Sequence, residues 1–168
     1  MNIRPARMID TPALADILAE RQKDSRYYGV DEVDLPYAKK LIGAGIQRHG
    51  HTTDGGCFVM VAEDEDGAVM GFVYGMLSRV YHVGHKLAAT DVFLIGRKDC
   101  PALALTHLFD AYLDWARANP RVVEIGASWS DVIPGSDGFA SIYIRKGFRH
   151  CGSTYRLDNS VQIEGEAA

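Results

Sequence analysis

The middle of the chain has the hydrophobic pattern of strands. Residues 57–63 (CFVMVAE) and 69–77 (VMGFVYGML) are short and apolar, and Asp66-Gly67 between them is typical of a hairpin turn. Residues 87–95 (LAATDVFLI) end in a nearly continuous apolar run, which predicts a strand covered on both faces. These three segments predict the antiparallel front of a sheet.

The pattern then changes to that of an amphipathic helix. Apolar positions recur at intervals of three and four residues until an Asn-Pro pair, which disfavours the helical conformation. The positions that share this face are Leu105, Leu108, Phe109, Tyr112 and Ala116. A helix over this segment would follow the third strand and cross one face of the sheet.

Shorter segments complete the predicted order of elements. Near the N-terminus, Asp10 is a candidate N-cap for a first helix, and Pro12 fits the first turn of that helix. Near the C-terminus, Gly147 ends a short helix. The other predicted elements are a strand at 2–8, a helix at 36–48, a strand at 122–130 and a strand at 148–157.

Together these elements run β-α-α-β-β-β-α-β-α-β and predict an α/β fold. We expect one domain over residues 1–157, with a mixed, mostly antiparallel sheet and helices on both faces. Residues 158–168 lack periodicity, which predicts a flexible tail. Open α/β sheets bind ligands at the C-terminal ends of their strands, so a site is expected where residues 87–95 meet the next helix.

Composition narrows the range of functions. The chain has 168 residues, with 18 Lys and Arg against 22 Asp and Glu and a net charge of −4. This balance disfavours a protein that binds nucleic acid or an anionic membrane. The cysteines are odd in number and lack a CxxC spacing, which disfavours both a disulfide framework and a metal site. No stretch has the pattern of a signal peptide or a membrane span, so we expect a cytoplasmic protein.

Two segments resemble the GNAT N-acetyltransferase superfamily. The first, DVFLIGRKDCPALALTHLFDAYLDWA, is similar to the strand, pyrophosphate loop and long helix of that family. The second, ASIYIRKGFRHCGSTY, is similar to its A-x-x-L-Y-E-K-L-G-F signature, and Tyr143, Gly147 and Phe148 keep the spacing of that signature without a gap. The order of elements also matches that of the family over nearly the whole chain.

The pyrophosphate loop departs from the family pattern. Where the family usually has R/Q-x-x-G-x-G/A, residues 97–102 read RKDCPA. In one register Arg97 takes the Arg/Gln position; in the gapless register, Cys100 and Pro101 stand where Arg and Gly are expected. In either register Pro101 lacks an amide donor and Asp99 adds a negative charge, so diphosphate binding is expected to be weakened.

The resemblance implies an acetyl-CoA-dependent enzyme that transfers an acetyl group directly to an amine of a small molecule or a protein. Arg97 and Lys98 are candidates to pair with the phosphates of the cofactor, although a solvated basic pair is an equal alternative. The residues that the resemblance assigns to the cofactor are Phe93, Leu94, Ile95, Arg97, Lys98, Cys100, Ala102, Leu103 and Ala104.

Two residues are candidates for proton transfer. Asp91 lies among apolar neighbours that would partly desolvate it, which raises a carboxyl pKa toward that of a useful base; the alternative is a structural cap. Tyr143 fits the acid that protonates the departing thiolate, and its alternative is a core tyrosine. His82 or His85 as the base and Cys100 as a nucleophile are lesser alternatives.

Substrate contacts are expected from the loops between the helices and strands. Tyr27, Tyr28, Tyr81 and Trp129 are the candidates to wall a pocket, although each also fits ordinary packing. Two rival functions remain: a binding or regulatory protein that has lost cofactor affinity, and an assembly protein. In the second, the strand at 148–157 would pair with another copy to give a homodimer.

Overall fold

A computed structural model describes residues 1–130 and 132–156. The chain forms one five-stranded sheet in which the strands follow their sequence order. Neighbouring strands are antiparallel from β1 to β4, and β5 is parallel to β4. The strands are β1 (Asn2–Pro5), β2 (Cys57–Glu63), β3 (Val69–Arg79), β4 (Leu87–Gly96) and β5 (Val122–Gly126).

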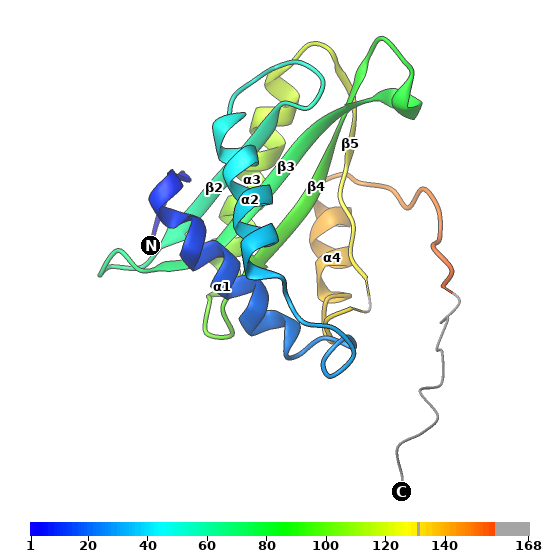
Figure 1. Cartoon of the computed structure of the whole chain (residues 1–168). Helices are drawn as coiled ribbons and strands as arrows, with labels where there is room; N and C mark the ends of the chain where they lie inside the picture. The colour runs from blue at the N-terminus through cyan, green and yellow to red at the C-terminus, as the bar shows by residue number, and fades with distance from the viewer. Residues whose placement is uncertain (131, 157–168) are drawn as a thin grey trace, which may run out of the picture.

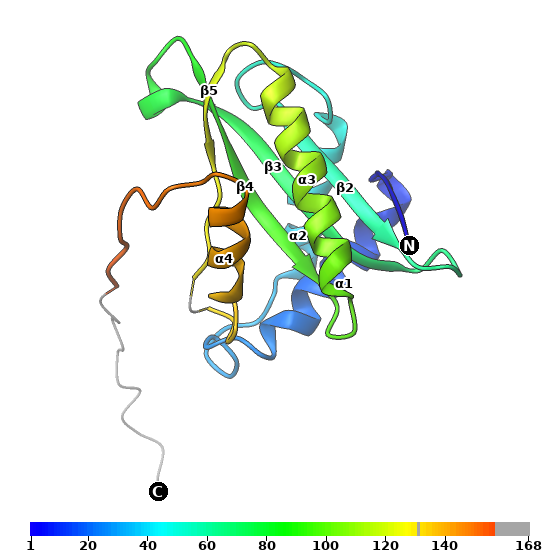
Figure 2. The same ribbon diagram turned by 180° about the vertical axis from the view of Figure 1, so that it is seen from behind.

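Helices cover both faces of the sheet. Figure 1 shows α1 and α2 on one face, and the reverse view in Figure 2 shows α3 and α4 on the other. The helices are α1 (Thr11–Gln22), α2 (Leu35–Gln47), α3 (Ala102–Ala118) and α4 (Gly138–Arg145), with short 3-10 turns η1 (Met8–Asp10) and η2 (Val80–His82). The mixed, mostly antiparallel α/β fold expected from the sequence is therefore confirmed.

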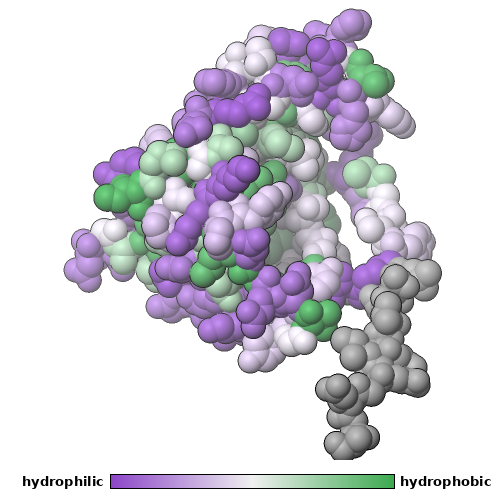
Figure 3. All heavy atoms as spheres, in the orientation of Figure 1, coloured by the Kyte–Doolittle hydropathy of each residue, from purple (hydrophilic) through white to green (hydrophobic). Residues whose placement is uncertain are grey.

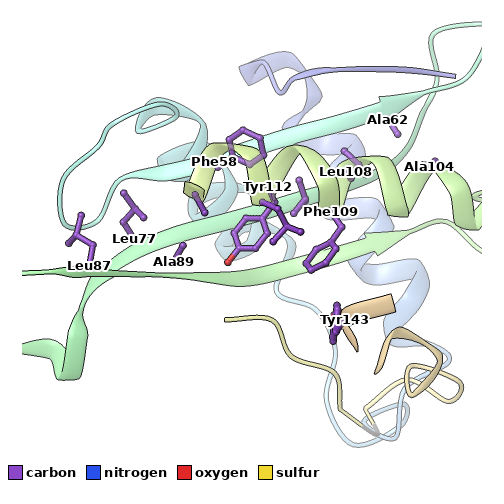
Figure 4. Close-up of a cluster of buried hydrophobic side chains, with 13 residues drawn as sticks. Phe58, Ala62, Leu77, Leu87, Ala89, Ala104, Leu108, Phe109, Tyr112 and Tyr143 are labelled. Atoms are coloured by element: carbon purple, nitrogen blue, oxygen red, sulfur yellow. The ribbon is translucent and has the colours of Figure 1, made fainter. Parts of the chain in front are cut away.

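Each face of the sheet has its own hydrophobic core. The core under α3 contains the predicted helix face, with Leu108, Phe109 and Tyr112 at most 1% exposed (Figure 4). Gly75 of β3 is required here, because a Cβ at that position would lie 2.7 Å from the Tyr112 ring. The core under α1 and α2 is built around residues such as Phe72 of β3. Removing one such large side chain costs roughly 3–5 kcal/mol of stability.

A bulge in β4 positions the functional part of the sheet. Gly75 pairs with Asp91 and Tyr74 pairs with Phe93, so Val92 is an extra residue without a partner on β3. Such a bulge bends its strand. Tyr74 and Gly75 are neighbours on β3 and therefore point to opposite faces of the sheet. Their partners on β4 do the same, so Asp91 lies on the α3 side, whereas Phe93 packs with Tyr74 on the α1 side.

β4 and β5 separate just before this bulge. Their parallel pairing ends at Thr90 and Gly126, so the second half of β4 has no strand partner on its outer edge among the described residues. Figure 1 shows β5 diverging from β4 in this region, with α4 beyond it. The divergence leaves a backbone edge exposed at the C-terminal end of β4.

The C-terminal strands are shorter than the sequence predicts. β5 ends at Gly126 rather than at residue 130. The predicted strand at 148–157 is wrong over its described part, because residues 148–156 adopt no regular structure. Gly147 has a φ of +90° and ends α4, and Phe148 alone in this segment packs on the core. The rest of the segment offers no apolar face for a sheet.

The start of the chain also differs from expectation. The first strand ends at Pro5, and Asp10 precedes α1 without capping it through its side chain. The buried Asp10 carboxylate instead pairs with Arg4, with an Nη1–Oδ2 distance of 2.6 Å. Hydrogen bonds to this guanidinium hold the pKa of the Asp10 carboxyl below its usual range.

The predicted tail at 158–168 lies outside the described residues. No helix in the described ranges is long and apolar enough to cross a bilayer.

Candidate functional site

A cleft of about 590 Å³ opens beside the exposed edge of β4. Its walls come from three places: the second half of β4, the region from α1 to α2, and the chain that leads from β5 into α4. In the space-filling view, the surface is hollowed between these elements and pale or green atoms line the hollow (Figure 3). The site therefore lies at the C-terminal end of β4, as the sequence predicts.

Asp91 forms part of the wall of this cleft. Its Oδ1 accepts a hydrogen bond of 3.2 Å from the backbone amide of Ser128. Burial raises the pKa of the Asp91 carboxyl to about 6, because desolvation disfavours the charged form more than the bonds from Ser128 favour it. At neutral pH this carboxylate is ionised and is more basic than an ordinary aspartate.

Tyr143 reaches the same cleft from α4. Its ring packs against Phe109 and Phe148, and its hydroxyl donates a hydrogen bond of 3.0 Å to the carbonyl of Ser128. Burial, followed by the nearby charge of Asp91, raises the pKa of the phenol well above its usual range. Tyr143 therefore keeps its proton at neutral pH.

Ser128 links the two candidates for proton transfer through its backbone. Its amide donates to Asp91 and its carbonyl accepts from Tyr143, so one residue positions both side chains. Sequence reasoning missed this role, because residue 128 was assigned to the predicted strand. The only available signal was the serine-rich segment that follows Gly126.

The second half of β4 lies along the cleft. Phe93, Leu94 and Ile95 all line the cleft, and their side chains also pack into the cores on alternate faces. Phe93 makes an edge-on contact with Phe72, with ring centroids 5.9 Å apart. The side chains thus anchor the strand, while its outer backbone edge faces the cleft.

Ion pairs with Glu20 of α1 and with Asp24, just after α1, hold the loop that follows β4. The Arg97 guanidinium lies 3.1 Å from Glu20, and the Lys98 ammonium lies 2.7 Å from Asp24. The backbone amide of Lys98 donates to the same Glu20 carboxylate at 2.9 Å. The two basic residues expected to meet a diphosphate are therefore already paired within the protein.

A smaller cavity of about 200 Å³ lies beside this loop. Arg21, Arg97 and Lys98 line it, and it shares Leu94 and Ile95 with the main cleft. Sequence reasoning missed Arg21, because only the packing of α1 beside the loop brings it to this cavity. The cavity and the cleft together follow the edge of β4.

The beginning of α3 combines packed and exposed residues. Cys100 packs against Gly96, where a Cβ would lie 2.7 Å from its Sγ, and burial raises the pKa of its thiol. A neutral, packed thiol does not suit a nucleophile. The amide of Ala104 donates to Pro101, whereas helix geometry leaves the amides of Ala102 and Leu103 without intrahelical acceptors.

The four aromatic candidates divide into two pairs. Tyr27 and Trp129 line the cleft. Tyr28 is 67% exposed and Tyr81 is 91% exposed, and neither is among the lining residues. Tyr81 lies in η2 with His82, near the end of the sheet opposite α1 (Figure 1). The structure therefore does not bring Tyr81 or His82 to the site.

The acidic, histidine and cysteine side chains do not suggest a metal centre. No group of three or more of these residues lies close enough to hold an ion in the part of the chain that the structure describes. The polar groups that converge on the cleft are instead suited to binding an organic substrate and moving a proton.

Solved structures with the same fold include acetyltransferases. A probable acetyltransferase superposes with a TM-score of 0.68 at 19% identity, covering 95% of this chain and 99% of its own. A ribosomal-protein-alanine N-acetyltransferase from Brucella melitensis biovar Abortus 2308 gives 0.61 at 16% identity, covering 94% and 99%. Glucosamine-6-phosphate N-acetyltransferase from Arabidopsis thaliana gives 0.66 at 9% identity, covering 95% and 98%.

The likeness is one of fold rather than of sequence. No protein-family model and no curated protein matches the chain at the sequence level. The superpositions nevertheless cover nearly all of both chains, so the overall fold is shared with these structures.

Proposed function

Because this chain has the fold of the GNAT acetyltransferases, we propose that it is an acetyl-CoA-dependent N-acetyltransferase that transfers the acetyl group directly to an amine. The observation that carries the proposal is the pairing of Asp91 and Tyr143 in one cleft beside the open edge of β4. The carboxylate is a base with a raised pKa, and the phenol keeps its proton.

Asp91 and Tyr143 supply the two proton transfers of the reaction. The Asp91 carboxylate accepts a proton from the substrate ammonium, directly or through water, and the free amine attacks the thioester carbonyl. A C–N bond forms as the C–S bond breaks, and the departing thiolate takes its proton from the Tyr143 hydroxyl. The nitrogen, which carries one proton too many after the attack, gives that proton to the Tyr143 phenolate. Reprotonation of Tyr143 and release of the proton from Asp91 restore the starting state.

The β4 edge and the neighbouring loop fit an extended donor with a phosphate end. Backbone groups of Phe93 to Ile95 would hydrogen-bond the amides of the pantetheine arm, as an added strand would. The amides of Ala102 and Leu103, with Arg21, would meet the diphosphate at the start of α3. Arg97 and Lys98 join them once their ion pairs with Glu20 and Asp24 open.

A binding and turnover assay tests the proposal. Acetyl-CoA should raise the melting temperature of the protein, and thiol release in the presence of an amine panel should exceed that of acetyl-CoA alone. The three thiols Cys57, Cys100 and Cys151 are free in the structure. The protein must therefore be kept reduced, and its own thiols subtracted. Acetyl-CoA binding without turnover of any amine would contradict the enzymatic proposal.

The ion pairs of the loop favour one second candidate. Glu20 accepts the amide of Lys98 and pairs with the guanidinium of Arg97, so neither group is open to a phosphate. This is what we would expect of a site with weakened cofactor affinity. A binding or regulatory protein that retains the fold would then use the cleft for a small ligand without transferring an acetyl group. The absence of any thermal shift at millimolar acetyl-CoA would favour this candidate over the enzyme.

A further inference from the structure

We propose that the acyl acceptor is a small monoamine with an aromatic or bulky apolar body. This inference rests on the proposed function, because it names the substrate class of the same cleft. Three features of the acceptor end carry it: the number of acidic groups, the nature of the walls and the closure of the outer rim.

Two carboxylates line the cleft, and one of them also caps a helix. Asp91 and Asp34 are its only acidic lining residues within the described chain. Asp34 is engaged as the N-cap of α2, where its Oδ1 accepts the amide of Tyr37 at 2.9 Å. Arg21 lines the same wall and is paired with Asp24 at 3.2 Å. Asp34 already accepts a helix amide, so the carboxylate open to a substrate ammonium is that of Asp91, which one ammonium group matches better than several do.

Aromatic and aliphatic side chains wall the acceptor end. Tyr27, Tyr37 and Trp129 remain 42%, 62% and 49% exposed and line the cleft together with Val33 and Leu41. Large aromatic rings left partly uncovered within a concave site offer stacking surfaces to an apolar ligand. A planar or bulky apolar group would cover these rings while its amine reaches Asp91.

A backbone hydrogen bond closes the outer rim of the cleft. The amide of Arg26, between α1 and α2, donates to the carbonyl of Val132, before α4, at 3.0 Å. The Arg26 guanidinium also lies over the Tyr27 ring, 4.8 Å from its centroid, and so orients that ring. Because the two walls are tied together, a molecule of modest size fits the cleft better than a folded protein does.

A matched amine series tests the acceptor class. Thiol release is measured with 2-phenylethylamine, 2-cyclohexylethylamine, ethylamine, spermidine and a peptide with a free N-terminus. We expect kcat/KM to be at least tenfold higher for the two ring-bearing amines than for the other three. A preference for ethylamine, spermidine or the peptide would overturn the inference while leaving the proposed acetyl transfer in place.

Ligand-observed NMR keeps the two proposals separable. Saturation transfer to 2-phenylethylamine needs no cofactor, and Trp129→Ala should weaken this binding about tenfold, mainly through KM where turnover is measured. Tyr155→Ala removes an aromatic side chain that is 92% exposed outside the cleft, and should bind as the wild type does. Binding without turnover supports this acceptor class and counts against acetyl transfer. No binding of either ring-bearing amine, or equal binding by Trp129→Ala, overturns the inference.

Discussion

The two ends of the site differ in how their charged groups are used. At the acceptor end, Asp91 is largely desolvated, keeps a raised pKa and accepts hydrogen bonds from Ser128 without a cationic partner among the groups that shift that pKa. At the phosphate end, Arg97 and Lys98 are matched by Glu20 and Asp24. The first arrangement leaves a charge available for chemistry, whereas the second neutralises charges before any ligand arrives. The proposed proton-transfer group and the proposed phosphate-binding groups thus differ in whether their charges are already paired within the protein.

The largest effect is expected from Asp91→Asn. Loss of the base should lower kcat/KM by roughly 100-fold or more. Removal of an ionised, desolvated carboxylate should at the same time stabilise the fold at neutral pH by roughly 2 kcal/mol, because the folded protein raises that pKa above its ordinary value. Activity assays and thermal unfolding check both parts. Asp66→Asn, in the exposed β2–β3 turn, is the matched control, and a destabilised, fully active Asp91→Asn would contradict the assignment.

Tyr143→Phe should reduce kcat by roughly 10- to 100-fold if the phenol protonates the thiolate. The lost bond to Ser128 should cost about 1 kcal/mol of stability. Tyr112→Phe is a close control, because the Tyr112 hydroxyl also donates to a backbone carbonyl, that of Gly126 at 2.9 Å, without lining the cleft. Equal losses of activity in both variants would assign Tyr143 a structural role only.

The pH profile should report the same carboxylate. With a pKa of about 6, Asp91 is increasingly protonated below that pH, so kcat/KM should fall about tenfold per pH unit there and reach a plateau above it. The residual activity of Asp91→Asn should not show this fall in kcat/KM at low pH. A wild-type profile that is flat between pH 5 and 7 would show that no group with this pKa limits the reaction.

The smallest effect is expected at the phosphate end. Glu20→Gln frees the charge of Arg97 and weakens the acceptor of the Lys98 amide, so the Kd for acetyl-CoA should fall about threefold to tenfold. Calorimetric titration measures this change. Asp16→Asn, one turn earlier on α1 and exposed, should leave the Kd unchanged. An unchanged or higher Kd in Glu20→Gln would mean that the α1 ion pairs do not compete with the donor.

Local pattern was sufficient for most of the fold and for the position of Asp91. The apolar run around Phe93 predicted a strand covered on both faces, and its side chains do pack into both cores. The apolar neighbours of Asp91 likewise predicted its desolvation, which the raised pKa confirms. These features depend on residues close in sequence, so they can be read from spacing alone.

Features that depend on distant segments could not be predicted. Glu20 and Lys98 are 78 residues apart, and only the packing of α1 beside the loop brings them together. Ser128 contacts both Asp91 and Tyr143 through its backbone, and these backbone bonds leave no trace in residue type. The predicted strand at 148–157 is wrong over its described residues because an extended chain also needs an apolar face to pack on the core, and among residues 148–156 Phe148 is the one that packs there.

The surplus residue in β4 has an engineering consequence. Deleting Val92 alone would restore a regular ladder, with Gly75 still opposite Asp91 and Tyr74 still opposite Phe93. A straightened β4 would then be free to continue its parallel pairing with β5 beyond Thr90 and to close the space between them. A single surplus residue thus separates a sheet that opens into a cleft from one that would remain closed.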